Sequence, residues 1–259
     1  MTNMTTMSVC ENAERFMEGG KLNFIEVLGW AMQTPGVKID RASFLRKELG
    51  RYFEDDVVEE AIRFNPARAG IVRADIDEIA DSVIAYENAK VSTMSFLASI
   101  PGGMAAVGAS TADMISYCAF SVRVIQKLAY LYGFPEFDLE EDSLDSETMQ
   151  TIILFLGTMF GVQEAAKLMM QYAELYACNY AKRLARKSLT KGLIYPMVKK
   201  ICKEIGIRMT KQIFADTIAS AIPIVSGFAS GGLTYLAFGQ SCTRLQSALK
   251  KNRLCKNDW

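Results

Sequence analysis

The sequence predicts an all-α protein, a helical bundle with long, apolar, glycine-rich helical hairpins. Half of the 259 residues are hydrophobic, and most segments place their apolar residues at helical spacing. Alternating β-branched residues are scarce, so no strand is expected, and Gly and Pro mark the breaks between helices. A chain of this length can bury one large core or two small ones.

Four helices are expected in the first hundred residues: 23–32, 41–53, 55–64 and a long helix from Asp75 to about Ile100. Thr34-Pro35-Gly36 ends the first and Asn65-Pro66 the third, because glycine and proline interrupt helical hydrogen bonding. Asp40 has the residue type and the position of an N-cap for the second helix.

Turns and loops separate the helices that follow. A second long helix is expected over 111–132, then a solvated loop over 136–147, which holds seven acids and no base. Ser143 or Ser146 is expected to cap the next helix. Residues 151–187 form one very long helix or two joined ones. The expected structural turn residues are Pro101, Gly102, Gly103, Gly108 and Gly133.

One face of the 151–187 segment carries Tyr172, Tyr176, Tyr180 and Leu184 at four-residue spacing. We interpret this face as a core stripe, and a ligand-binding surface is the alternative.

Composition excludes several classes of protein. The 29 basic residues balance 29 acidic ones, so the chain is not a globally basic nucleic-acid binder. It has no histidine, which excludes Ser-His and Cys-His catalytic arrangements. No two of its six cysteines have zinc-site spacing, and no phosphate-cradling or dinucleotide motif occurs. We therefore expect no metal and no cofactor. No signal peptide is visible, so reduced cysteines inside the cell are expected.

Charge is strongly segregated along this neutral chain. Residues 182–211 hold ten Lys or Arg and one acid, a local balance of +9, and residues 217–243 contain no charge at all. Residues 91–112 form a second uncharged run, but both runs are too rich in Gly, Ser and Thr to favour a simple crossing of the bilayer. Basic residues beside apolar surface are typical of binding to acidic lipids. The candidate membrane-binding residues are Lys182, Arg183, Arg186, Lys187, Lys191, Lys199, Lys200, Lys203, Pro223, Gly227, Gly231 and Gly232.

Three pieces of sequence, in this order, resemble the EcsC protein family: IPGGMAAVGASTADM, VIQKLAYLYGFPEFDLE and IPIVSGFASGGLTYLAFGQSCTRLQSAL. The resemblance covers about two thirds of the chain. It implies a mostly helical, membrane-associated bacterial protein linked to transport or secretion, with no established reaction. We therefore expect an N-terminal helical region over 1–70, an EcsC-like helical domain over 71–250 and a basic C-terminal tail over 251–259.

The leading hypothesis is a non-enzymatic protein that binds anionic lipid on the cytoplasmic face of the cell membrane. Its basic segment docks on the inner leaflet, and a glycine-rich hairpin, broken near Pro223 or at Gly231-Gly232, inserts or binds lipid. A membrane transporter is the protein partner that the resemblance suggests, and nucleic acid is not expected as a partner.

Two alternatives from other classes stay open. The first is a soluble helical enzyme of hydrolase type or a binder of a small ligand or lipid, with Asp113 as the candidate catalytic residue in a pocket between the apolar hairpins. Asp113 could instead cap a helix after Gly108 or pair with a basic residue of another helix. The second alternative is a pore-forming effector.

Overall fold

The computed structural model describes residues 24–98, 109–139, 147–178, 200–205, 226–252 and 254. Every regular element in these ranges is a helix, which confirms the all-α prediction for this part of the chain. The helices are α2 (Phe24–Gln33), α3 (Arg41–Leu49), α4 (Asp55–Arg63), α5 (Arg73–Ala98), α6 (Ala109–Leu131), α7 (Glu147–Met159), α8 (Gln163–Cys178) and α11 (Ser226–Leu249). Residues 200–205 form a further short helical segment.

The first expected helices are found with small shifts at their ends. Asp40 caps α3 as predicted, because its carboxylate accepts a hydrogen bond of 2.7 Å from the backbone N–H of Ser43. The expectation that this helix continues to Phe53 is wrong. It ends at Leu49, whose carbonyl accepts bonds from both Tyr52 and Phe53 and so closes a turn.

The predicted stop at Gly133 is confirmed. Gly133 has a φ of +95°, a conformation that only glycine adopts readily. The N–H of Phe134 donates to the carbonyl of Ala129, and the N–H of Gly133 donates to Tyr130. These two bonds satisfy carbonyls at the end of α6, as in a Schellman motif.

The segment expected over 151–187 is broken after Met159. The same paired bonds close α7, from Val162 to the carbonyl of Gly157 and from Gly161 to Thr158. Gly161 has a φ of +74°, so the chain reverses there and α8 packs against α7. Of the tyrosine stripe, Tyr172 is buried in the core as predicted, and Tyr176, Tyr180 and Leu184 have no described side chains.

The expected hairpin break at Gly231-Gly232 is wrong. α11 runs without interruption from Ser226 to Leu249, so Gly227, Gly231 and Gly232 all lie inside one helix. A glycine costs a helix about 1 kcal/mol relative to alanine, which weakens it without ending it. The other residues expected at turns or helix caps lie outside the described residues: Pro101, Gly102, Gly103, Gly108, Ser143, Ser146 and Pro223.

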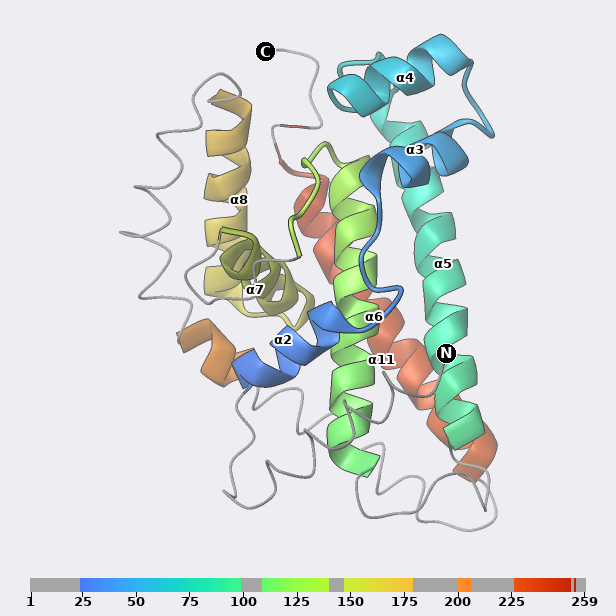
Figure 1. The fold of residues 1–259 in the computed structure, drawn as a ribbon, viewed down its shortest axis with the longest axis vertical. Coiled ribbons are helices and arrows are strands. Elements are labelled where there is room, and N and C mark those ends of the chain that lie inside the picture. The colour runs from blue at the N-terminus through green and yellow to red at the C-terminus, as the bar shows by residue number, and fades with distance from the viewer. Residues whose placement is uncertain are drawn as a thin grey trace.

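The centre of the molecule is α6, with α5 on one side and α7 and α8 on the other, and α11 crosses behind it and contacts all four (Figure 1). Nearly every side chain from Ile115 to Tyr132 is buried, so α6 is enclosed on all sides. α2 packs across α6, and α3 and α4 lie together over one end of the bundle. One continuous hydrophobic cluster joins these elements, from Phe24 to Leu254.

Two buried side chains tie the N-terminal part to α6. The guanidinium of Arg41 donates to four backbone carbonyls, those of Phe134, Ile62, Ala61 and Phe64. It thereby satisfies carbonyls at the end of α4 and just beyond α6. Gln126 accepts from the N–H of Ile39 and donates to the carbonyl of Val37, which fixes the linker between α2 and α3.

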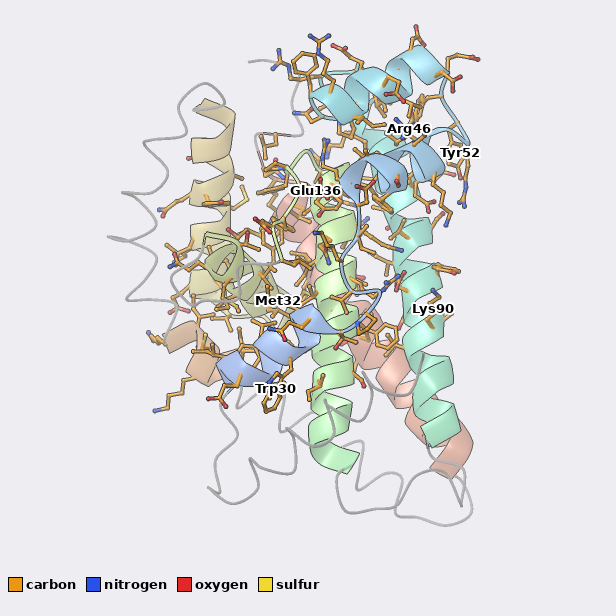
Figure 2. The ribbon with its side chains drawn as sticks, in the orientation of Figure 1. Trp30, Met32, Arg46, Tyr52, Lys90 and Glu136 are labelled. Carbon is orange, nitrogen blue, oxygen red and sulfur yellow. The ribbon has the colours of Figure 1, made fainter. Side chains whose placement is uncertain are left out.

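The exposed charges of α3 and α4 pair with each other at the surface. Arg46 lies between these helices and contacts Glu59 at 2.6 Å, with about half of each side chain exposed (Figure 2). Such an exposed pair contributes little to stability. Among the helices in the described ranges, none is both long enough and apolar enough to cross a membrane.

Candidate functional site

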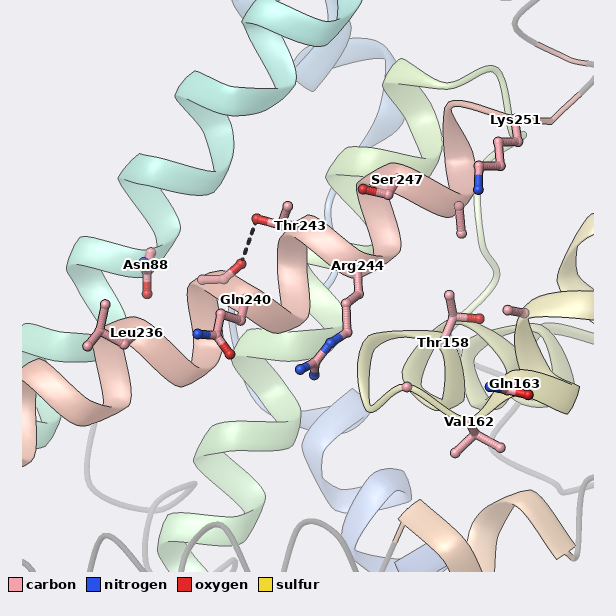
Figure 3. A pocket seen from close by; sticks show the side chains of 14 residues that line it. Asn88, Thr158, Val162, Gln163, Leu236, Gln240, Thr243, Arg244, Ser247 and Lys251 are labelled. Atoms are coloured by element: carbon pink, nitrogen blue, oxygen red, sulfur yellow. Dashed lines mark hydrogen bonds between the residues drawn. The ribbon is translucent and has the colours of Figure 1, made fainter.

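A groove of about 670 Å³ runs along α11, opposite the turn that joins α7 to α8 (Figure 3). This volume is in the range typical of small-molecule sites. Thr158, Gly161, Val162, Gln163 and Ala166 line it from α7, the turn and α8, and Asn88 of α5 lines one end.

The sequence of α11 produces two different faces. Phe238, Cys242, Leu245 and Leu249 are buried at three- and four-residue spacing and pack into the core. The opposite stripe lines the groove. It begins with the exposed Leu236 and is otherwise polar or small, with Gly239, Gln240, Thr243, Arg244 and Ser247. Short side chains such as Gly239 and Ser247 keep this face of the helix open as a trough.

The groove carries positive charge. Arg244 and Lys251 are exposed and line it, and its lining includes no carboxylate. Within the part of the chain that the structure describes, neither side chain forms an ion pair. Arg244 extends from α11 into the space facing Val162 and Gln163 (Figure 3). An arginine in this position can hold a phosphate or carboxylate through two parallel hydrogen bonds.

Beside the groove, α5 and α6 share a buried ion cluster of Glu87, Arg123 and Lys127. The Nζ of Lys127 lies 2.6 Å from Oε1 of Glu87, and Arg123 contacts the same oxygen at 3.5 Å. Arg123 also donates to the backbone carbonyl of Gly36. Burial alone would raise the pKa of Glu87, but the hydrogen bond and charge of Lys127, with Arg123, hold that pKa below its ordinary value. Glu87 is therefore ionised, and Lys127 and Arg123 balance its charge.

Three cysteines have described side chains, Cys118, Cys202 and Cys242, and all three are buried, free thiols. Burial raises the pKa of Cys118 and of Cys202 to about 12, and it also raises the pKa of Cys242. A thiol that stays protonated at neutral pH is a poor nucleophile. Among the described residues, no group of three or more Cys, Asp or Glu could hold a metal ion.

The residues predicted from the sequence to be functional lie in different parts of the structure. Lys200 and Lys203 are exposed on the helical segment 200–205, and Gly133 ends α6. Asp113 is the fifth residue of α6, so the interpretation that it caps this helix is wrong, and its side chain lies outside the part that the structure describes. Seven candidate membrane-binding residues lie outside the described residues: Lys182, Arg183, Arg186, Lys187, Lys191, Lys199 and Pro223.

Sequence reasoning missed the groove. It treated Arg244 and Lys251 only as parts of a basic C-terminal end. The missed signal is the stripe of polar and small residues at three- and four-residue spacing from Leu236 to Lys251, where a core-facing stripe would be apolar.

No family model, no curated protein and no solved structure matches this chain.

Proposed function

We propose that this chain is a non-enzymatic helical protein that binds the anionic surface of the cell membrane from the cytoplasmic side, where it assists transport or secretion. The observation that carries the proposal is the form of the helical segment 200–205, the described part of the basic segment. It turns its lysines to solvent and its isoleucines to the core.

The helical segment 200–205 is anchored on α7. Ile201 and Ile205 are fully buried, and a Cβ added to Gly157 would lie 2.9 Å from Cγ2 of Ile201. The absence of a side chain at Gly157 therefore allows this close approach. The anchor fixes the two lysines on a rigid support, which reduces the conformational entropy lost when they bind a surface.

The exposed lysines remain available to a partner. The Nζ of Lys200 lies 4.0 Å from Glu164, and its side chain is 66% exposed. An exposed pair at this distance is weak and screened by salt. Each Lys or Arg close to an acidic bilayer contributes about 1 kcal/mol to binding, and the sequence places eight further basic residues in 182–211.

The test is co-sedimentation of the full chain with vesicles that contain acidic phospholipid. Lys200→Gln/Lys203→Gln is expected to weaken binding by about 2 kcal/mol, roughly thirtyfold, because two surface charges are lost. High salt should weaken wild-type binding as well.

A matched control removes two lysines from another surface. Lys47 of α3 and Lys90 of α5 are exposed, and Figure 2 shows Lys90 on the outer side of α5. Lys47→Gln/Lys90→Gln is expected to bind acidic vesicles as the wild type does. Equal binding by both double variants, or equal binding to purely zwitterionic vesicles, would contradict docking through this segment.

A further inference from the structure

We propose that the groove beside α11 holds one molecule of a single-chain phospholipid with a phosphate monoester head. The phosphate lies at Arg244 and Lys251, and the acyl chain lies toward Leu236. This inference rests on the proposed function, because the bilayer is the source of the lipid. It adds a stoichiometric ligand site that is separate from the exposed lysines of the helical segment 200–205.

The charge of the groove matches this head group. Arg244 and Lys251 supply two positive charges, and no carboxylate lines the groove to neutralise them. A phosphate monoester carries about −1.5 to −2 charges at neutral pH. Lys251 is seven positions after Arg244 and two residues beyond the end of α11, and both are long, exposed side chains on the lining of one groove, so both can turn toward one phosphate.

The groove changes character along its length. At the end opposite Lys251 it is lined by Gly239 and by Leu236, whose side chain is 60% exposed. A leucine this exposed gains free energy when an acyl chain covers it. Val162 and Ala166 add apolar surface from the α7–α8 side. An amphiphile therefore has one favoured direction in the groove.

The Leu236 end of the groove is the end nearer to the glycine-rich start of α11. Gly227, Gly231 and Gly232 lie in the first two turns of α11, and Leu236 follows one turn later. These three glycines are among the candidate membrane-binding residues predicted from the sequence. An acyl chain leaving the membrane along α11 would therefore reach the Leu236 end of the groove first.

The test is isothermal titration calorimetry of the full chain with decanoyl lysophosphatidic acid, kept below its micelle-forming concentration. The wild type is expected to bind one molecule per chain. Arg244→Gln/Lys251→Gln should bind at least about tenfold more weakly, because two charge-assisted contacts are lost. Ser247→Leu, which fills the middle of the groove, should lose binding. Decanoyl lysophosphatidylcholine, which has no net charge, should bind at least about tenfold more weakly than the acid.

The matched control is Arg63→Gln/Lys90→Gln, which removes the same two residue types from exposed positions of α4 and α5. It is expected to bind the lipid with wild-type affinity. Urea midpoints identical to that of the wild type would show that Ser247→Leu and the charge variants are folded.

Several results would overturn the proposal. Equal affinity of the wild type and Arg244→Gln/Lys251→Gln would remove the head-group site. Equally tight binding of glycerol 3-phosphate would assign the groove to a soluble phosphate. Light scattering that gives a dimer for the wild type and a monomer for Ser247→Leu would assign it to a second copy of the chain.

Vesicle binding separates this proposal from the proposed function. Lys200→Gln/Lys203→Gln should bind vesicles about thirtyfold more weakly and keep lysophosphatidic acid binding, whereas Ser247→Leu should keep vesicle binding and lose lysophosphatidic acid binding. Vesicle binding without saturable binding of lysophosphatidic acid would contradict the lipid site in the groove and leave surface docking in place. Saturable lipid binding without vesicle binding would sink surface docking alone.

Discussion

The Nζ of Lys127 on α6 lies 2.6 Å from Oε1 of Glu87 on α5, and the Glu87 side chain has no exposed surface. The other carboxylate oxygen, Oε2, has no hydrogen-bond partner among the described residues. Arg123 supplies a second positive charge from one turn earlier on α6. The two helices are thus joined by charges that would be costly to leave alone in the core.

Removing one member of this pair is expected to destabilise the fold strongly. Lys127→Met should lower the free energy of unfolding by about 3–5 kcal/mol, because Glu87 is left buried with only the longer contact to Arg123. Glu87→Leu/Lys127→Met removes both charges, and we expect it to be more stable than Lys127→Met. Urea unfolding followed by circular dichroism measures both differences. A double variant less stable than Lys127→Met would show that Glu87 still stabilises the fold without Lys127, which would contradict this account.

Acid is expected to weaken the same contact. The pKa of Glu87 is lower in the folded chain than in the unfolded chain, so the unfolded state binds more protons as the pH falls. Stability from Glu87 is therefore complete above about pH 4.3, the pKa of an unfolded glutamate, and declines as the pH drops toward the folded value. Urea midpoints measured from pH 6 to pH 3 should fall more steeply in the wild type than in Glu87→Gln. Asp40, whose pKa is lowered by its hydrogen bonds from Ser43, is present in both chains and cancels. Parallel curves would contradict the role of Glu87.

Arg41 offers a test of the contacts at the top of the bundle. Arg41→Lys keeps the charge, but an ammonium cannot reach the carbonyls of Phe134, Ile62 and Phe64 as the planar guanidinium does. We expect a loss of at least about 3 kcal/mol, because buried carbonyls are left without donors. Arg46→Lys on the same helix is the control, and its exposed pair with Glu59 predicts a change within about 0.5 kcal/mol. Similar losses for both variants would contradict this account.

Local signals explain which helix boundaries were predictable. Asp40 and Gly133 act within a few residues of their own positions, through an N-cap bond and a positive φ. The break at Gly161 was left open because it interrupts an apolar run with no proline or polar cluster to mark it. At Gly231-Gly232 the error was the opposite one, because a break was predicted where the helix continues. Glycine permits a turn but does not require one.

The groove was not predictable from local patterns. Its lining joins α5, α11 and the α7–α8 turn, which are up to 163 residues apart in the chain, from Asn88 to Lys251. Whether an exposed cation such as Arg244 faces another helix across a groove or faces open solvent depends on those long-range contacts. The same limit applies to Glu87, whose burial follows from the position of α6 and not from its own neighbours in sequence.

Gly133 and Gly70 both have a positive φ, but they differ in how closely other atoms approach them. Substitutions at these two positions therefore separate the cost of backbone strain from the cost of crowding. Gly70 has a φ of +82° and an added Cβ would meet nothing within 4 Å. Gly70→Ala should therefore cost only the left-handed backbone, about 1–2 kcal/mol. At Gly133 an added Cβ would lie 3.1 Å from Cβ of Leu254 and 3.2 Å from its carbonyl oxygen.

Gly133→Ala is expected to cost about 1–3 kcal/mol more than Gly70→Ala, because Leu254, only 1% exposed, would have to move out of its core position. Urea unfolding of the two variants measures the difference. In a Leu254→Gly background the Cβ–Cβ contact is absent, so the Gly133→Ala step should cost less there than in the wild type. Equal costs in the two backgrounds would show that Leu254 does not pack on the end of α6.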